Sequence, residues 1–159
     1  MGRFTYEPSE GPAQYRRTLY AFWRRSIAPT FLFDSAQRRA CEVRTPRTNT
    51  PLQALTLLND ENYLEASRAL AALAMEQSDP LGEMALRVLS RELTDRERSV
   101  LIRERDKALE YYRDRPDAAA QLLARGHFIP KAELSGTDLA AYSIVASMFL
   151  NLDEAITHE

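Results

Sequence analysis

Residues 139–150 read LAAYSIVASMFL, a run that is apolar on nearly every face of a helix. The uncharged stretch that contains it, residues 139–152, is 14 residues long. A membrane-spanning helix needs about 20 apolar residues, and a helix that is hydrophobic all round is typical of the centre of a globular fold. We therefore expect residues 138–150 to form a buried C-terminal helix, and the chain as written to be soluble.

Helix-start signals recur upstream of this segment. Thr50 with Gln53 and Thr94 with Glu97 have the spacing of capping boxes, and Asp79 precedes a proline at the first helical position. Helices are predicted from residue 50 to about 58, 61–77, from 80 to about 89, from 94 to about 112, and from 114 to 126. Asn59 is predicted to cap the second of these, Gly126 to end the fifth in a left-handed conformation, and Ser135 or Thr137 to cap the last.

Apolar spacing predicts which helix faces are buried. In residues 61–77 the predicted inward stripe is Tyr63, Ala66, Leu70, Leu73 and Ala74. In the next two helices it is Leu81, Met84, Ala85, Val88 and Leu89, then Leu101, Ala108, Leu109 and Tyr112. The charged run 91–115 is interpreted as a solvated face with mixed-sign pairs at three- and four-residue spacing.

These signals predict an all-α fold, an irregular bundle of five to seven helices around the C-terminal one. At 159 residues the chain is expected to form a single domain, with residues 1–14 as an irregular lead-in. The N-terminal third is rich in proline and aromatic residues. Within it, residues 15–27 (YRRTLYAFWRRSI) fit either a helix or a strand.

The charges are unevenly distributed, although the net charge is only −2. Residues 1–50 carry nine Arg and four acidic residues, a balance of +5, which leaves −7 for residues 51–159. This balance argues against nucleic acid as a partner. One Cys excludes an internal disulfide, and two His are too few for a zinc site, so no metal or cofactor is expected.

Residues 44–53 (RTPRTNTPLQ) bring two guanidinium groups, hydroxyls and amides to a predicted helix N-terminus, a combination that can hold an anion or an acidic partner. The alternative is that these groups satisfy one another and cap the helix. Three arginine doublets, at 16–17, 24–25 and 38–39, are interleaved with the aromatic residues of 15–33. This pattern is typical of polyanion binders. The alternative is that the aromatic residues belong to the core and the arginine stems lie over them. The candidate binding residues are Arg44, Arg47, Thr48, Asn49, Gln53, Arg24 and Arg25.

The sequence offers no catalytic constellation. Cys41 and His127 could in principle form a nucleophile–base pair, but nothing in the sequence places them together. Asp153 and Glu154 follow the apolar run and are interpreted as a polar exit rather than metal ligands. We expect no catalytic residues, and the sequence favours a protein that is not an enzyme.

Three blocks carry a resemblance: residues 15–60, residues 87–97 (RVLSRELTDRE) and residues 139–159, with RTNTPLQALTLLND as the most specific part. They resemble the C-terminal planctomycete-type domain of unknown function, found in large, often cytochrome-c-associated proteins of Planctomycetes and relatives. The resemblance implies that the chain is the C-terminal part of a longer domain, in a parent protein exported to the periplasm or cell envelope. The family's haem motif CxxCH is absent, so covalent haem is not expected here.

Two hypotheses of function follow. The first is a non-catalytic helical interaction or structural module, which binds a protein partner, an upstream part of its parent, or a second copy. The alternative is the binding part of an enzyme or receptor that acts on an anionic polysaccharide or another polyanion.

Overall fold

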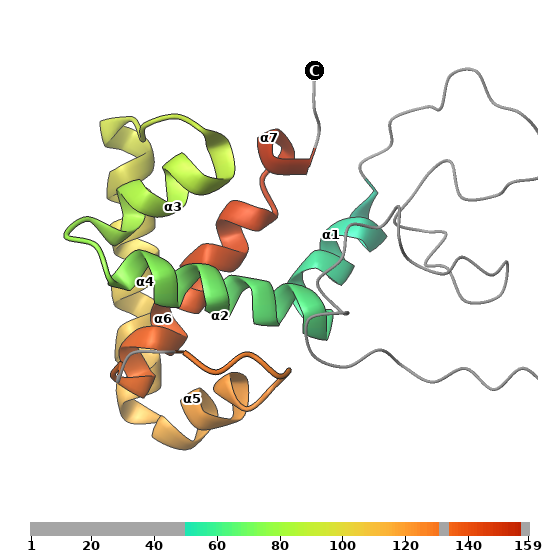
Figure 1. Ribbon diagram of the computed structural model, residues 1–159, viewed down its shortest axis with the longest axis vertical. Coiled ribbons are helices and arrows are strands. Elements are labelled where there is room, and N and C mark those ends of the chain that lie inside the picture. Colours follow the sequence, from blue (N-terminus) through green and yellow to red (C-terminus); the bar gives the residue numbers. More distant parts are fainter. Residues whose placement is uncertain (1–49, 131–133, 157–159) are drawn as a thin grey trace, which may run out of the picture. The chain divides into compact units, whose positions relative to one another are not determined.

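The computed structural model describes residues 50–130 and 134–156, all of which lie in one unit of the chain, residues 49–159. Every regular element in these residues is an α-helix (Figure 1). The helices are α1 (Pro51–Asn59), α2 (Glu61–Met75), α3 (Pro80–Leu89), α4 (Asp95–Asp114), α5 (Pro116–Leu123), α6 (Gly136–Leu150) and α7 (Asp153–Ile156). The predicted all-α class is confirmed in this part of the chain.

Helix α6 holds the described part together, because it contacts each of the other six helices. Its residues are buried on opposite faces, which explains why its sequence shows no polar stripe. The hydroxyls of Ser143 and Ser147 are satisfied inside the helix, donating to the carbonyls of Leu139 and Ile144 at 2.7 Å. The predicted central position of the C-terminal helix is therefore confirmed.

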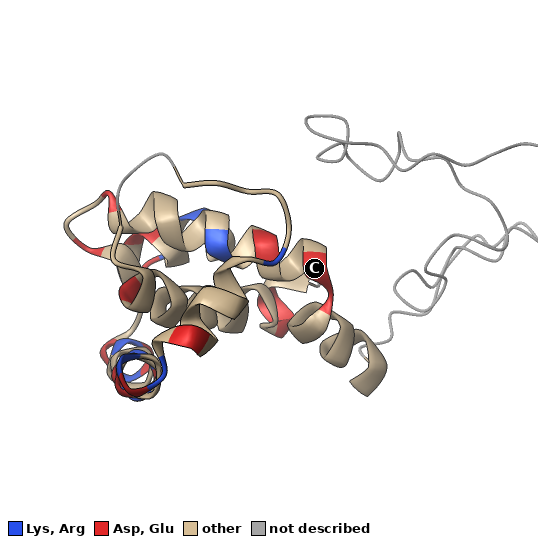
Figure 2. Ribbon diagram, turned by 90° about the horizontal axis from the view of Figure 1, so that it is seen from below, with Lys and Arg blue, Asp and Glu red and all other residues tan. Residues whose placement is uncertain are grey.

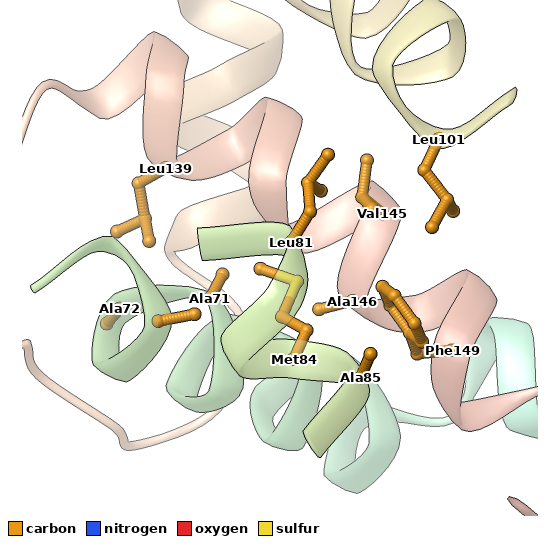
Figure 3. Packing of buried hydrophobic residues seen from close by; sticks show 11 residues of the cluster. Ala71, Ala72, Leu81, Met84, Ala85, Leu101, Leu139, Val145, Ala146 and Phe149 are labelled. Atoms are coloured by element: carbon orange, nitrogen blue, oxygen red, sulfur yellow. The ribbon is translucent and has the colours of Figure 1, made fainter. Parts of the chain in front are cut away.

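Two apolar clusters lie on either side of α6. The larger gathers α2, α3 and α4 around Leu139, Val145, Ala146 and Phe149 of α6 (Figure 3). The smaller packs Tyr112 of α4 and Ala119 of α5 against the alanines at 140 and 141. The inward stripes predicted for α3 and α4 supply these contacts, with Leu81, Met84, Ala85 and Leu101 buried.

The local start signals form as predicted. Thr50 with Gln53 and Thr94 with Glu97 make complete capping boxes, and Asp79 caps α3 ahead of Pro80. Ser135, one of the two candidates, caps α6. The prediction for Asn59 is wrong. Asp60 ends α1 and caps α2, because its carboxylate accepts from the backbone N–H of Asn62 at 2.9 Å.

The inward face of α2 also differs from the prediction. Leu73 is 44% exposed and Ala66 is exposed, although both were assigned to the buried stripe. The face turned inward instead carries the charged residues Glu65 and Arg68 beside Ala71, Ala72 and Ala74. Burial of these charged side chains is possible because they bond the backbone of the loop after α5.

Helix α5 ends at Leu123, three residues before the expected Gly126. Gly126 is nevertheless left-handed, with φ +74°.

In Figure 2, which looks along α4, charged residues ring that helix. Its ion pairs differ from the expectation. Within the run 91–115, the pair Lys107–Glu104 has the predicted three-residue spacing. The pairs Arg103–Glu104 and Arg105–Asp106 join adjacent residues instead. Arg98 pairs with Asp79, and Arg91 pairs with Glu97 and with the distant Glu154.

The predictions for residues 1–14, for residues 15–27 and for the aromatic-rich N-terminal third lie outside the described residues. The single-domain organisation over 1–159 likewise stays a prediction.

Candidate functional site

Of the candidate binding residues, Gln53 is described, whereas Arg24, Arg25, Arg44, Arg47, Thr48 and Asn49 lie outside the described residues. The side-chain oxygen of Gln53 accepts from the backbone N–H of Thr50 at 2.6 Å, and its own backbone N–H donates to Thr50 Oγ1 at 3.3 Å. Gln53 thus completes the capping box. Its side-chain NH2 group is not used by that box.

An apolar groove of about 260 Å³ opens on the surface between α3, α4 and α6. Its walls are formed by Leu89, Leu93, Val100, Leu101, Met148, Phe149 and Leu152, together with Arg96 and Glu97. Val100 is 36% exposed and Leu152 is 42% exposed, so part of this apolar lining faces solvent. Sequence patterns do not predict this groove, since its walls come from segments up to 63 residues apart (Leu89 to Leu152).

Local sequence signals set each wall of the groove. Ser90, with φ 57°, ends α3 in a left-handed conformation just after Leu89. The capping box at Thr94 then starts α4, and Val100 and Leu101 follow in its second turn. The opposite wall is the last turn of α6, where Met148 and Phe149 precede the end of the helix at Leu150.

Arg91 forms a cluster of three charged residues with Glu97 and Glu154 at the groove. The Arg91 Nε and Nη2 donate to the two carboxylate oxygens of Glu154, each at 2.8 Å. Nη2 and Nη1 also donate to Glu97, at 2.8 and 3.1 Å. The sequence interpretation of Glu154 as a plain polar exit is therefore incomplete, because its carboxylate joins the C-terminal helix α7 to the turn between α3 and α4.

The carboxylates of this cluster are held in their charged form. Hydrogen bonds from Arg91, and then from the backbone and side chain of Thr94, lower the pKa of Glu97 to about 2. The same guanidinium lowers the pKa of Glu154, and the two acids together raise the pKa of Arg91. Glu97 is therefore ionised at neutral pH with its oxygens occupied, which makes it a poor general acid or base. The groove is suited to contact through its carbon surface.

A second charged group, on α2, holds the loop after α5. Arg68 is 3% exposed and donates to the carbonyl oxygens of Leu123 and Phe128, the latter at 2.8 Å. Glu65 accepts from the backbone N–H of His127 at 3.0 Å, and Glu61 from that of Gly126 at 3.0 Å. These bonds hold a structural turn rather than open a site. His127, one of the two residues considered for catalysis, contributes its backbone N–H to this turn.

A mixed cleft of about 390 Å³ lies between α4 and α6, with Arg105 over the Tyr142 ring at 6.0 Å. Arg105 also bonds Asp106 at 2.7 Å, so its charge is already paired.

Among residues 50–130 and 134–156, no three His, Cys, Asp or Glu side chains converge as a metal would require. Within the same residues, no helix has the length and apolarity to cross a bilayer.

The comparison with protein families decides the identification. The sequence model of the PSD1 family, described as a protein of unknown function (DUF1553), matches residues 3–104, more than half of the chain. The chain belongs to this family. The PSD1 match confirms the resemblance to a planctomycete-type domain of unknown function. No curated protein matches the chain. No solved structure matches it either.

The stretch matched by the PSD1 model contains one wall of the groove and not the other. It includes α1, α2, α3 and the first half of α4, and therefore the wall formed by Leu89, Leu93, Val100 and Leu101. The α6 wall and Leu152 follow after residue 104. The residues that close the groove thus lie outside the matched stretch.

Proposed function

We propose that the chain is a non-catalytic helical interaction module within a larger envelope-associated protein. Its described contact surface is the α3–α4–α6 groove, which receives apolar side chains from a helix of a protein partner. The observation that carries this proposal is the groove itself, a surface hollow whose walls are apolar except for Arg96 and Glu97.

The size of the groove favours a protein partner over a small molecule. Small-molecule pockets enclose about 300–1,000 Å³, whereas this groove measures about 260 Å³ and is open to solvent. Such a volume suits a few side chains. Partner helices commonly place apolar anchors at positions i, i+3, i+4 and i+7 into a groove of this kind.

The segment 44–53 supplies polar contacts in the same proposal, through Arg44, Arg47, Thr48, Asn49 and Gln53. Forked guanidinium donors suit a carboxylate on a partner. Replacing Arg44 and Arg47 with Ala is expected to weaken binding of the natural partner while the thermal midpoint stays nearly unchanged. A large loss of stability would show that the two arginines are structural instead.

The groove is tested with a helical peptide of 14 residues that carries Leu at the four anchor positions and neutral Gln elsewhere. Titration into the full chain is followed by anisotropy of a label on the peptide and by amide NMR shifts. We expect saturable binding, with the largest shifts at Val100, Leu101 and Phe149, because these residues line the groove.

A pair of matched double variants locates the binding. Val100→Gln/Leu152→Gln removes the exposed lining and is expected to weaken binding at least tenfold. Ile129→Gln/Leu73→Gln likewise replaces two branched aliphatic residues with Gln, at positions that are 83% and 44% exposed and do not line the groove. This control is expected to leave binding unchanged. Equal losses in both variants, or no saturable binding, would overturn the proposal. Retention on a sulfated glycan column that falls with salt would favour the polyanion alternative.

A further inference from the structure

The charges that surround the groove set the chemistry of its partner. Besides Arg98, which is paired with Asp79 at 2.8 Å, the segments at the groove carry two arginines and five carboxylates. The arginines are Arg91 and Arg96, and the carboxylates are Glu92, Asp95, Glu97, Asp153 and Glu154. The balance is −3, in a part of the chain, residues 51–159, that itself carries −7.

Both arginines are already included in this balance. Arg96 is exposed and lines the groove, so it offsets one carboxylate. Arg91 is bound by both Glu97 and Glu154, so that cluster as a whole carries one negative charge. Glu92 and Asp95 are exposed and adjoin the groove residues Leu93 and Arg96 in sequence, and both lie near enough to Arg98 to interact with it electrostatically. An apolar groove with this border attracts a positively charged partner and repels an acidic one.

We propose that the occupant of the α3–α4–α6 groove is a basic amphipathic helix of a protein partner, with Leu- or Phe-type anchors on one face and Lys or Arg beside them. This inference rests on the proposed function, because it names the partner class for the same groove. The apolar anchors enter the groove. The basic residues lie over the border, where exposed charges govern association rate and salt dependence.

Three peptides separate this inference from the proposed function. They share the four Leu anchors and differ on the polar face, which carries Lys, Gln or Glu. At low ionic strength we expect affinity to fall in the order Lys, Gln, Glu, with at least a tenfold difference between the first and the last. Raising the salt to about 1 M, where the Debye length is about 3 Å, is expected to bring the three affinities together.

Charge-neutralised variants of the full chain place the effect at the groove. Glu92→Gln/Asp95→Asn is expected to reduce the preference for the Lys peptide over the Glu peptide at least threefold. Glu110→Gln/Asp114→Asn makes the same change of charge on exposed residues at the other end of α4. Fifteen residues separate Asp95 from Glu110, which is about 22 Å along a helix, so this control is expected to leave the preference unchanged.

The outcomes are distinct. If all three peptides bind the groove equally, or the Glu peptide binds best, the charge inference is overturned and the interaction module stands. If none binds, both fail. Self-association that disappears in Val100→Gln/Leu152→Gln would identify a second copy as the occupant and overturn the inference. The expected order of affinities, lost in the groove variants and kept in the controls, supports it.

Discussion

Arg68 of α2 binds Phe128 in two ways across 60 residues of sequence. Its Nη2 donates to the Phe128 carbonyl oxygen at 2.8 Å, and its guanidinium carbon lies 5.8 Å from the centre of the Phe128 ring. One side chain therefore fixes both the backbone and the ring of a loop residue. Together with Glu61 and Glu65, it determines where the chain runs between α5 and α6.

Replacing Arg68 with Met tests this role. The change leaves the part-buried carbonyls of Leu123 and Phe128 without their donor, and a polar group left unsatisfied away from water costs about 1–3 kcal/mol. We expect a loss of about 3 kcal/mol in the free energy of unfolding from urea titration. Arg125→Met, at an exposed position in the same loop, serves as the control. Equal stabilities of the two variants would contradict the role assigned to Arg68.

Gly126→Ala is expected to destabilise the same turn. Gly126 has φ +74°, and a Cβ there would collide with the Glu65 carboxylate that accepts from His127. A left-handed non-glycine residue costs about 1–2 kcal/mol before the collision is included. Gly136→Ala is the matched control, because its added Cβ would lie an ordinary 3.7 Å from Leu123. If both substitutions shift the thermal midpoint equally, the glycine at 126 is not required by the turn.

Phe149→Ala tests the central position of α6. Phe149 is 1% exposed in the larger cluster, and truncating a buried Phe costs about 3–5 kcal/mol. Leu73→Ala removes an apolar side chain that is 44% exposed on α2, and surface changes of this kind stay within about 0.5 kcal/mol. Urea unfolding of both variants measures the difference. A larger loss at Leu73 would restore the stripe predicted from sequence.

The Arg91 cluster predicts a pH dependence at the acidic end. The folded pKa of Glu97 is about 2, below its ordinary value of 4.5, and that of Glu154 is also lowered. Groups with a depressed folded pKa contribute stability above their unfolded pKa, and this contribution is lost as the pH falls through the folded pKa. The free energy of unfolding is therefore expected to decline between about pH 4.5 and pH 2.

Arg91→Met removes this cluster and is expected to flatten that decline, so that the two proteins converge near pH 2. Because all three side chains are exposed, the difference at neutral pH is expected to be small and to shrink with salt. Arg113→Met, at an exposed position in the last turn of α4, should keep the wild-type profile. A Glu97 carboxyl titration near 4.5 by NMR would contradict the assignment.

Local features of the described fold were predictable to within a few residues. Both threonine capping boxes and the Asp79 cap involve atoms three residues apart, so the sequence contains both partners of each bond. The apolar run of residues 139–150 likewise excludes a surface position for α6. The error at Asn59 is of the same local kind, since the neighbouring Asp60 is an equally good cap.

The groove and the buried face of α2 were not predictable in this way. The spacing of apolar residues predicted that Leu73 lies on the inner face of α2. Glu65 and Arg68 lie there instead, because their hydrogen-bond partners are in a loop about 60 residues later in the chain. The pairing of Arg91 with Glu154 also joins segments 63 residues apart.

The sequence by itself determined the helical class, the starts of the helices and the interior position of α6. These features depend on hydrogen bonds within one turn and on the burial of a segment that has no polar face. Tertiary structure alone decided which charged residues are buried and where apolar side chains remain open to solvent. The physical reason is that a charge can be buried only when its partner is present, and the path of the chain brings that partner near.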